Sequence, residues 1–129
     1  MTKISYIKET DSKNFIMVDG GMNVLIRPSM YDAYHHPMLV NIKNTEKFTC
    51  DIVGPICESG DVIVKDIEFE KPNGKNYIVF LSAGAYGYSM SSMYNLHGLV
   101  CEVWIDNGQI KQIRKPIKFD DLIKFEECF

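Results

Sequence analysis

Short apolar or β-branched runs, each followed by turn-forming residues, recur along most of this chain of 129 residues and constrain its fold more than any other feature. Runs of this kind that end at Gly, Pro, Asn, Asp or Ser predict β-strands. Asn107-Gly108 separates the last two runs, and because this dipeptide accepts positive φ at both positions, it predicts a tight hairpin. The predicted strands cover residues 3–8, 15–18, 38–42, 49–53, 62–69, 77–81, 99–105 and 109–114.

Helices are predicted to be few and short. Pro28 suits a first helical turn that continues to Tyr34, and residues 120–127 place apolar side chains at partly amphipathic spacing. Residues 71–75, KPNGK, predict a surface turn. The chain has the length of one domain and shows no internal repeat or linker. Many short strands with little helix therefore predict a mainly β fold, a small barrel or a sandwich.

Charge and hydropathy argue against two classes of partner. The 14 basic and 17 acidic side chains give a net charge of −3 without a basic stripe, so nucleic acid is not expected as a partner. No stretch approaches the roughly 18 apolar residues of a membrane span, and the N-terminal residues alternate in polarity instead of forming an apolar leader. We therefore expect a soluble protein without a membrane partner.

The cysteines and histidines predict neither disulfides nor a metal site. The four cysteines contain no CxxC pair and are interpreted as free thiols, which indicates a reducing, cytoplasmic location. His35 and His36 are adjacent, and consecutive side chains diverge on a helix or a strand. No acidic cluster completes a site with them, so a metal is not expected.

The octapeptide GPICESGD, residues 54–61, brackets a thiol and a carboxylate with turn formers. Pro55 fixes its own φ, and the flanking glycines permit unusual backbone shapes, so Cys57 and Glu58 are expected on a constrained loop. A thiol with an ordinary pKa of about 8.5 is mostly protonated at neutral pH and can donate a proton, while a carboxylate can bind an ammonium group. On its own, the pair is weak evidence for catalysis, because a free Cys is most often a small buried residue and an exposed Glu is most often only solvated.

Two further segments occur in a fixed order with this octapeptide. Residues 19–31 read DGGMNVLIRPSMY, and residues 84–95 read GAYGYSMSSMYN. Together the three motifs resemble the C-terminal part of the diaminopimelate decarboxylase family, which belongs to the fold type III pyridoxal-phosphate group, and the similarity runs from about residue 4 to residue 124. The resemblance implies a small Greek-key β-barrel like the C-terminal domain of the alanine racemase and ornithine decarboxylase-like group.

The resemblance also implies roles for five residues. Cys57 matches the proton donor, and Glu58 matches the residue that binds the amino group at the far end of the substrate. Arg27 and Tyr31 match a substrate-binding pair. Their four-residue spacing places them on the same side of a helix start, where a guanidinium can hold the distal carboxylate by two parallel hydrogen bonds. Tyr86 matches a tyrosine that contacts the cofactor phosphate and the substrate.

Interpretations without a functional role also remain open for these residues from the sequence alone. Arg27 can cap a turn before Pro28, and Tyr31 and Tyr86 can be ordinary packing residues. The chain also departs from the family after Asn95, where residues 96–100 read LHGLV in place of an Arg-rich stretch, which leaves the local contacts and the substrate open.

The resemblance implies that residues 1–129 form the C-terminal β-barrel domain of a decarboxylase that converts meso-2,6-diaminopimelate to L-lysine and CO₂. The family's N-terminal β/α barrel carries the lysine that holds pyridoxal 5'-phosphate, and because it is absent from this chain, the isolated chain is expected to be inactive. The expected partners are that barrel, an amino-acid substrate and a second subunit, whose active site Cys57 and Glu58 complete.

Two alternatives stay open at this point. One is a noncatalytic β-domain that binds or regulates a partner decarboxylase, and the other is the same domain from a decarboxylase of another amino-acid derivative. A domain that packs against a barrel is also expected to expose an apolar face. The side chains expected there are Tyr88, Met90, Met93 and Tyr94.

Overall fold

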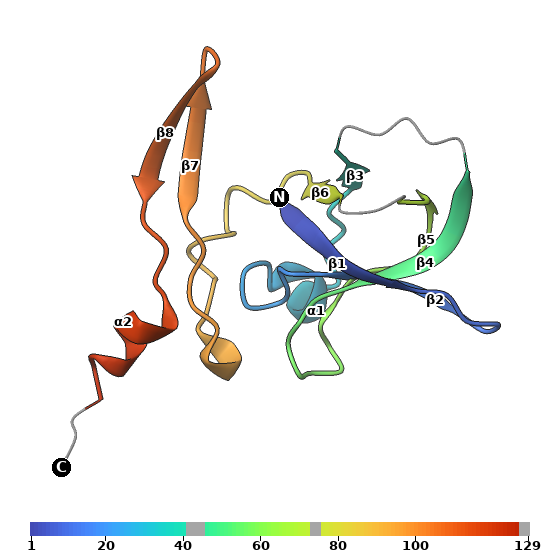
Figure 1. Cartoon of the computed structure of the whole chain (residues 1–129), viewed down its shortest axis with the longest axis horizontal. Coiled ribbons are helices and arrows are strands. Elements are labelled where there is room, and N and C mark those ends of the chain that lie inside the picture. Colours follow the sequence, from blue (N-terminus) through green and yellow to red (C-terminus); the bar gives the residue numbers. More distant parts are fainter. Residues whose placement is uncertain (41–45, 73–75, 127–129) are drawn as a thin grey trace.

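The computed structural model describes residues 1–40, 46–72 and 76–126, and the described chain is mainly β (Figure 1). In chain order its strands are β1 (Thr2–Lys8), β2 (Asn14–Val18), β3 (Pro37–Leu39), β4 (Lys47–Val53), β5 (Val62–Glu70), β6 (Tyr77–Phe80), β7 (Glu102–Asp106) and β8 (Gln109–Arg114). The helices are α1 (Arg27–Tyr31), the 3₁₀ turn η1 (Tyr94–Leu96) and α2 (Phe119–Ile123).

Six strands form one curled sheet, and the other two form a separate hairpin (Figure 1). The sheet order is β3-β6-β1-β2-β4-β5, with β2 and β4 parallel and the other neighbours antiparallel. The pairing of β4 with β5 shifts its register near Asp66, whose φ of 47° is left-handed. Irregularities of this kind bend a strand and increase its twist. They help the sheet to curl into a nearly closed barrel.

The irregularity in β5 is held by a buried carboxylate. Asp51 is 5% exposed, and its Oδ1 accepts the backbone N–H of Asp66 at 2.8 Å. Lys13 Nζ lies 2.9 Å from Asp51 and 3.1 Å from Asp66, which neutralises the buried charge. The pair therefore fixes the bend of β5 instead of leaving an uncompensated ion inside the sheet.

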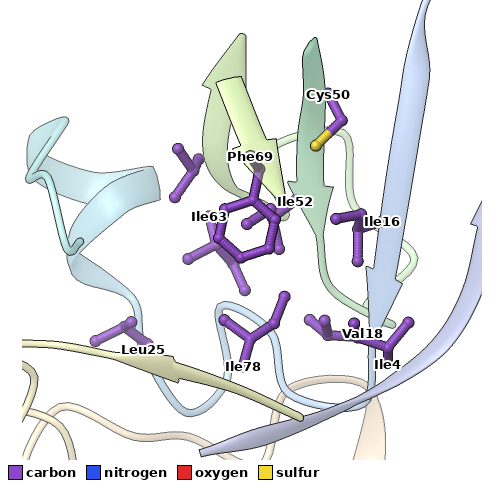
Figure 2. Packing of buried hydrophobic residues seen from close by; sticks show 10 residues of the cluster. Ile4, Ile16, Val18, Leu25, Cys50, Ile52, Ile63, Phe69 and Ile78 are labelled. Atoms are coloured by element: carbon purple, nitrogen blue, oxygen red, sulfur yellow. The ribbon is translucent and has the colours of Figure 1, made fainter. Parts of the chain in front are cut away.

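Apolar side chains from the curled sheet fill its interior (Figure 2). Ile16, Ile52 and Ile78 come from three different strands and are each 0% exposed. Figure 2 shows these side chains turned toward a common space beside the ring of Phe69. The buried cluster comprises Ile4, Ile16, Val18, Leu25, Cys50, Ile52, Ile63, Val64, Phe69 and Ile78.

The predicted fold class, a small mainly β barrel with short helices, is confirmed. The strands predicted at 3–8, 15–18, 49–53, 62–69 and 77–81 all form, with ends that differ by at most two residues. These strands could be predicted because their apolar side chains pack in the core, so that packing and local propensity favour the same conformation.

The predicted hairpin also forms. Asn107 and Gly108 have φ values of 47° and 76°, as a tight turn of this type requires. The first hairpin strand begins at Glu102 instead of residue 99, because Leu99 pairs with Ile117 in an isolated bridge.

Other predicted elements extend further than the structure shows. The helix expected to reach Tyr34 ends at Tyr31, because Asp32 adopts φ 53° and its N–H returns to the carbonyl of Arg27. The strand predicted at 38–42 is described only to Leu39, and its last two residues lie outside the described ranges. The turn at 71–75 and the end of the helix predicted at 120–127 also fall partly outside them; α2 itself ends at Ile123.

The hairpin of β7 and β8 lies apart from the six-stranded sheet, as does α2 (Figure 1). Both expose a large apolar surface that the sequence analysis did not predict. The exposed side chains are Val103, Trp104, Ile105, Ile110 and Ile113 of the hairpin, Phe119 and Ile123 of α2, and Phe125 just after it. Of the face that was expected, Met93 and Tyr94 are exposed, whereas Tyr88 and Met90 are half-buried. None of the helices in the described ranges is long and apolar enough to span a bilayer.

Replacing Ile52 with Ala is expected to lower the free energy of unfolding by about 2–5 kcal/mol, because it leaves a cavity among fully buried side chains. Ile110→Ala is the matched control, since it removes the same atoms from a side chain that is 74% exposed and should change stability by less than about 0.5 kcal/mol. Urea unfolding followed by circular dichroism measures both. Equal losses in the two variants would contradict the placement of the core.

Candidate active site

The loop at residues 54–61 joins β4 to β5 and closes on Asp61. The Gly54 N–H donates to the Asp61 carbonyl at 3.0 Å, and the Asp61 N–H donates to the Glu58 carbonyl at 3.0 Å. The Asp61 side chain is 3% exposed, and its Oδ2 accepts the N–H of Ile56 at 2.7 Å. These bonds hold the loop in a compact turn with Cys57 and Glu58 at its exposed tip.

A second turn leads into α1 and places Arg27. The Gly21 carbonyl accepts the N–H groups of both Val24 and Leu25 at 3.0 Å, and Leu25 is buried against the core. Pro28 then occupies the first helical turn, where its missing N–H costs no hydrogen bond. Arg27 therefore starts the helix at a point fixed by the turn before it and by the core beneath it.

Arg27, Tyr31, Tyr86 and Met90 line an open hollow of about 320 Å³. The guanidinium carbon of Arg27 lies 5.0 Å from the centre of the Tyr86 ring, a cation–π contact. The side chains of Tyr31 and Tyr86 are 60% and 53% exposed. The Nε of Arg27 is buried and has no hydrogen-bond partner in the described part of the chain. A buried donor without a partner is costly, and an anionic oxygen is the kind of acceptor that would satisfy a guanidinium N–H.

Glu58 accepts several hydrogen bonds at the tip of the loop. Its Oε1 accepts from the Ser59 hydroxyl at 3.2 Å and the Gly60 N–H at 3.4 Å, and its Oε2 accepts from the Tyr94 hydroxyl at 3.3 Å. These donors, the Gly60 backbone first, lower the pKa of Glu58 below its ordinary value of 4.5. The carboxylate is therefore charged at neutral pH and can bind a cation.

The segment at residues 84–95 packs against both turns. The Ser92 N–H donates to the Asn23 carbonyl at 2.8 Å, which ties the segment to the turn before α1, and Tyr94 reaches the loop tip through Glu58. Arg114 of β8 lies over the Tyr88 ring at 4.1 Å and pairs with Glu102 at 2.6 Å. The hairpin base therefore supports the segment that carries Tyr86.

The structure brings together three of the five predicted site residues. Arg27, Tyr31 and Tyr86 share the hollow, so the spacing argument for the first two correctly placed them on one side of the helix start. Cys57 and Glu58 lie together on the loop tip and are not among the side chains that line this hollow. Within one chain, the predicted residues therefore form two groups.

Sequence reasoning missed the contacts that join these groups. Tyr94 was expected on an apolar face, but its hydroxyl bonds Glu58. Ser29 donates to the Gly60 carbonyl at 2.6 Å, which links α1 to the loop. The sequence analysis assigns no role to Asp61, although an acidic residue directly after a Gly-containing turn is a signal for a carboxylate that closes the loop.

The two histidines considered as metal ligands have other partners. His35 is 3% exposed, and its Nδ1 bonds the Leu81 carbonyl at 3.1 Å. His36 Nδ1 lies 2.9 Å from the hydroxyl of Tyr34. The adjacent rings thus have separate partners, as expected for consecutive residues whose side chains diverge.

Comparisons with known proteins agree with this geometry. Residues 1–84 match the family described as pyridoxal-dependent decarboxylase, C-terminal sheet domain. The diaminopimelate decarboxylase of Aquifex aeolicus is 48% identical over 124 residues, which cover 96% of this chain and 30% of that protein.

Solved structures give the same result. The diaminopimelate decarboxylase of M. jannaschii in co-complex with L-lysine superposes with a TM-score of 0.93 at 35% identity, over 99% of this chain and 29% of that one. The Helicobacter pylori enzyme complexed with L-lysine superposes with a TM-score of 0.88 at 36% identity, over 96% of this chain and 30% of that one.

The curled sheet and its two site turns are therefore those of a pyridoxal-phosphate decarboxylase sheet domain. The chain belongs to the pyridoxal-dependent decarboxylase family, and its residues 1–84 match the C-terminal sheet domain of that family. The resemblance to diaminopimelate decarboxylases is confirmed over nearly the whole chain. The chain spans about 30% of the length of the Aquifex relative.

Tyr94→Phe is expected to raise the pKa of Glu58 toward its ordinary value of 4.5, because the variant removes one of the donors that stabilise the charged form. Since the pKa is lower in the folded state, the stabilisation that Glu58 gives the loop is present above the ordinary pKa. It is lost as the pH falls through the lowered value. Carboxyl chemical shifts followed by NMR titration measure the pKa. Tyr6→Phe, at a tyrosine that is 62% exposed on β1, is the control. An unchanged pKa in Tyr94→Phe would show that the hydroxyl contact is not maintained.

Proposed function

We propose that this chain is the C-terminal domain of a diaminopimelate decarboxylase, which converts meso-2,6-diaminopimelate to L-lysine and CO₂ in lysine biosynthesis. The observation that carries the proposal is the Arg27 guanidinium, which lies over Tyr86 with a buried, unpaired Nε in the described structure. A substrate whose distal end carries both a carboxylate and an ammonium needs a cationic group, such as this guanidinium, to bind the carboxylate. The two relatives solved with L-lysine support the same substrate class.

The substrate's distal carboxylate is assigned to Arg27 and Tyr31. A guanidinium offers parallel N–H donors to a carboxylate, a geometry that Lys cannot reproduce. The Tyr31 side chain lines the same hollow and is exposed enough for its hydroxyl to donate to a ligand. In this arrangement the hollow binds the end of the substrate that does not react.

Pyridoxal 5'-phosphate is the cofactor implied by the family. Tyr86 fits a place at its edge, because its side chain is 53% exposed and Gly84 beside it has open space where a Cβ would lie. When bound, the cofactor accepts the electron pair left by the departing carboxylate. The described residues lining the hollow include no lysine to hold it, so we assign that role to an N-terminal β/α barrel and residues 1–129 to the C-terminal domain.

Cys57 and Glu58 are assigned to the active site of a neighbouring subunit in a homodimer. Their exposure on a loop tip outside the hollow supports this assignment. The Cys57 thiol returns a proton to the carbon that has lost its carboxylate, and the Glu58 carboxylate binds the distal ammonium. We place the enzyme in the cytoplasm, where thiols such as the exposed Cys57 and Cys101 stay reduced.

Cys57→Ala and Glu58→Gln are expected to affect the full-length enzyme differently. Removing the proton donor should lower kcat by about 100- to 10,000-fold with little change in substrate preference. Removing the carboxylate charge should weaken the preference for diaminopimelate over a monoamino analogue by about 1.5–3 kcal/mol. Steady-state kinetics with both substrates measures these effects, and Ser12→Ala, on the exposed turn after β1, is the control. If Glu58→Gln kept the full preference for diaminopimelate over the monoamino analogue, Glu58 would not be a specificity residue.

Mixed dimers test whether the site is shared. Arg27→Ala and Cys57→Ala would each inactivate both sites of a homodimer, but a mixed dimer keeps one complete site if the two residues come from different subunits. Random reassociation should therefore restore about a quarter of the wild-type activity. Arg27→Ala mixed with Tyr86→Phe is the control, because both changes affect the same hollow and should restore nothing. Equal behaviour of the two mixtures would show that each site comes from one chain.

A further inference from the structure

One buried carboxylate joins the two groups of site residues. Asp61 Oδ1 accepts the N–H of Met22 at 2.6 Å, and Oδ2 accepts the N–H of Ile56 at 2.7 Å. Met22 belongs to the turn that leads to Arg27, whereas Ile56 directly precedes Cys57. The side chain is 3% exposed, so water does not compete for these bonds.

The Asp61 carboxylate fits between two backbone segments because the residues that face it, Gly21 and Gly54, lack a Cβ. A Cβ added at Gly21 would lie 2.4 Å from Asp61 Oδ2, and one added at Gly54 would lie 2.3 Å from the same atom. The Gly54 Cβ would also lie 2.4 Å from the Cα of Gly21. The two backbones therefore meet around the carboxylate, and neither position accepts a larger side chain without displacing it.

A second contact, at the surface, also connects the α1 region to the loop at residues 54–61. Ser29, in the first turn of α1, donates its hydroxyl to the Gly60 carbonyl at 2.6 Å. Both residues are exposed, so this bond is the weaker of the two links. It nevertheless connects the helix that begins with Arg27 to the loop that carries Cys57 and Glu58.

We infer that Asp61 is a positioning residue that sets the place of the Cys57-Glu58 loop relative to the turn before Arg27, with Ser29 as a secondary support. This inference rests on the proposed function for its catalytic consequence. If Cys57 and Glu58 serve the neighbouring subunit while Arg27 serves its own, Asp61 links the two active sites of a dimer. Displacements of about 1 Å at a site can lower the rate about 100-fold, so the loop must be held firmly relative to the turn before Arg27.

Asp61→Asn tests the inference in the full-length enzyme. The amide keeps the size of the side chain, but its NH₂ group meets a backbone N–H where an oxygen had accepted one. We expect kcat to fall at least about tenfold and the preference for diaminopimelate over a monoamino analogue to shrink several-fold. A simple loss of folded enzyme would lower both rates by the same factor and leave the preference unchanged. Asp32→Asn, exposed at the end of α1, is the matched control and should behave as the wild type.

Backbone amide hydrogen exchange gives a readout that does not depend on activity. In Asp61→Asn, the N–H groups of Met22 and Ile56 should exchange at least about tenfold faster, while those of β4 and β5 remain protected. Ser29→Ala changes an exposed residue, so the enzyme is expected to fold, and it should lower kcat by about fivefold.

The outcomes separate the two claims. Wild-type kcat, preference and exchange in a folded Asp61→Asn enzyme would overturn the inference. If Asp61→Asn does not fold, wild-type kcat in Ser29→Ala would overturn it. If the wild-type enzyme does not decarboxylate diaminopimelate, the proposed function fails, and the exchange rates at Met22 and Ile56 still decide the structural role of Asp61.

Discussion

The carboxylate of Asp61 is the interaction on which the arrangement of the candidate site depends. It accepts two backbone N–H groups from segments that are far apart in the sequence, those of Met22 and Ile56. Hydrogen bonds to an ionised acceptor are roughly twice as strong as neutral ones, and an uncompensated carboxylate at this depth would be costly. Because both donors are backbone groups, the geometry depends on Gly21 and Gly54, which leave space for the carboxylate, more than on the side chains at the donor positions.

The barrel core anchors both ends of this arrangement. Ile52 precedes the loop on β4 and Ile63 follows it on β5, and both side chains are buried in the core cluster. Ile56 and Asp61 are buried where the loop meets the sheet, while Cys57 and Glu58 are exposed at its tip. The core fixes the base of the loop, so the tip can contact another surface without a large loss of conformational freedom.

The barrel strands and the hairpin turn could be predicted from the sequence because local signals and core packing agree there. Asn107-Gly108 is such a case, and the placement of Arg27 and Tyr31 on one side of a helix start is another. The contact between Tyr94 and Glu58 could not be predicted, because it joins segments whose relation depends on the folded sheet. Leu96 adopts a φ of 57°, which a leucine rarely does, so no propensity argument anticipates the course of the chain beyond the segment at 84–95.

The hollow around Arg27 is too open to be a complete binding site. Small-molecule sites typically bury 70–90% or more of their ligand, whereas this hollow of about 320 Å³ has four lining side chains, two of them more than half exposed. The four lining side chains therefore cannot enclose a ligand by themselves, which agrees with the proposal that further walls come from an N-terminal barrel or a second subunit. The β7–β8 hairpin exposes apolar side chains, which include Trp104 and Ile105. An apolar surface of this kind is typical of a site where another protein surface packs. An open hollow, an exposed loop tip outside it and a large exposed apolar surface are together the features expected under the proposed function, in which this domain packs against other parts of an enzyme.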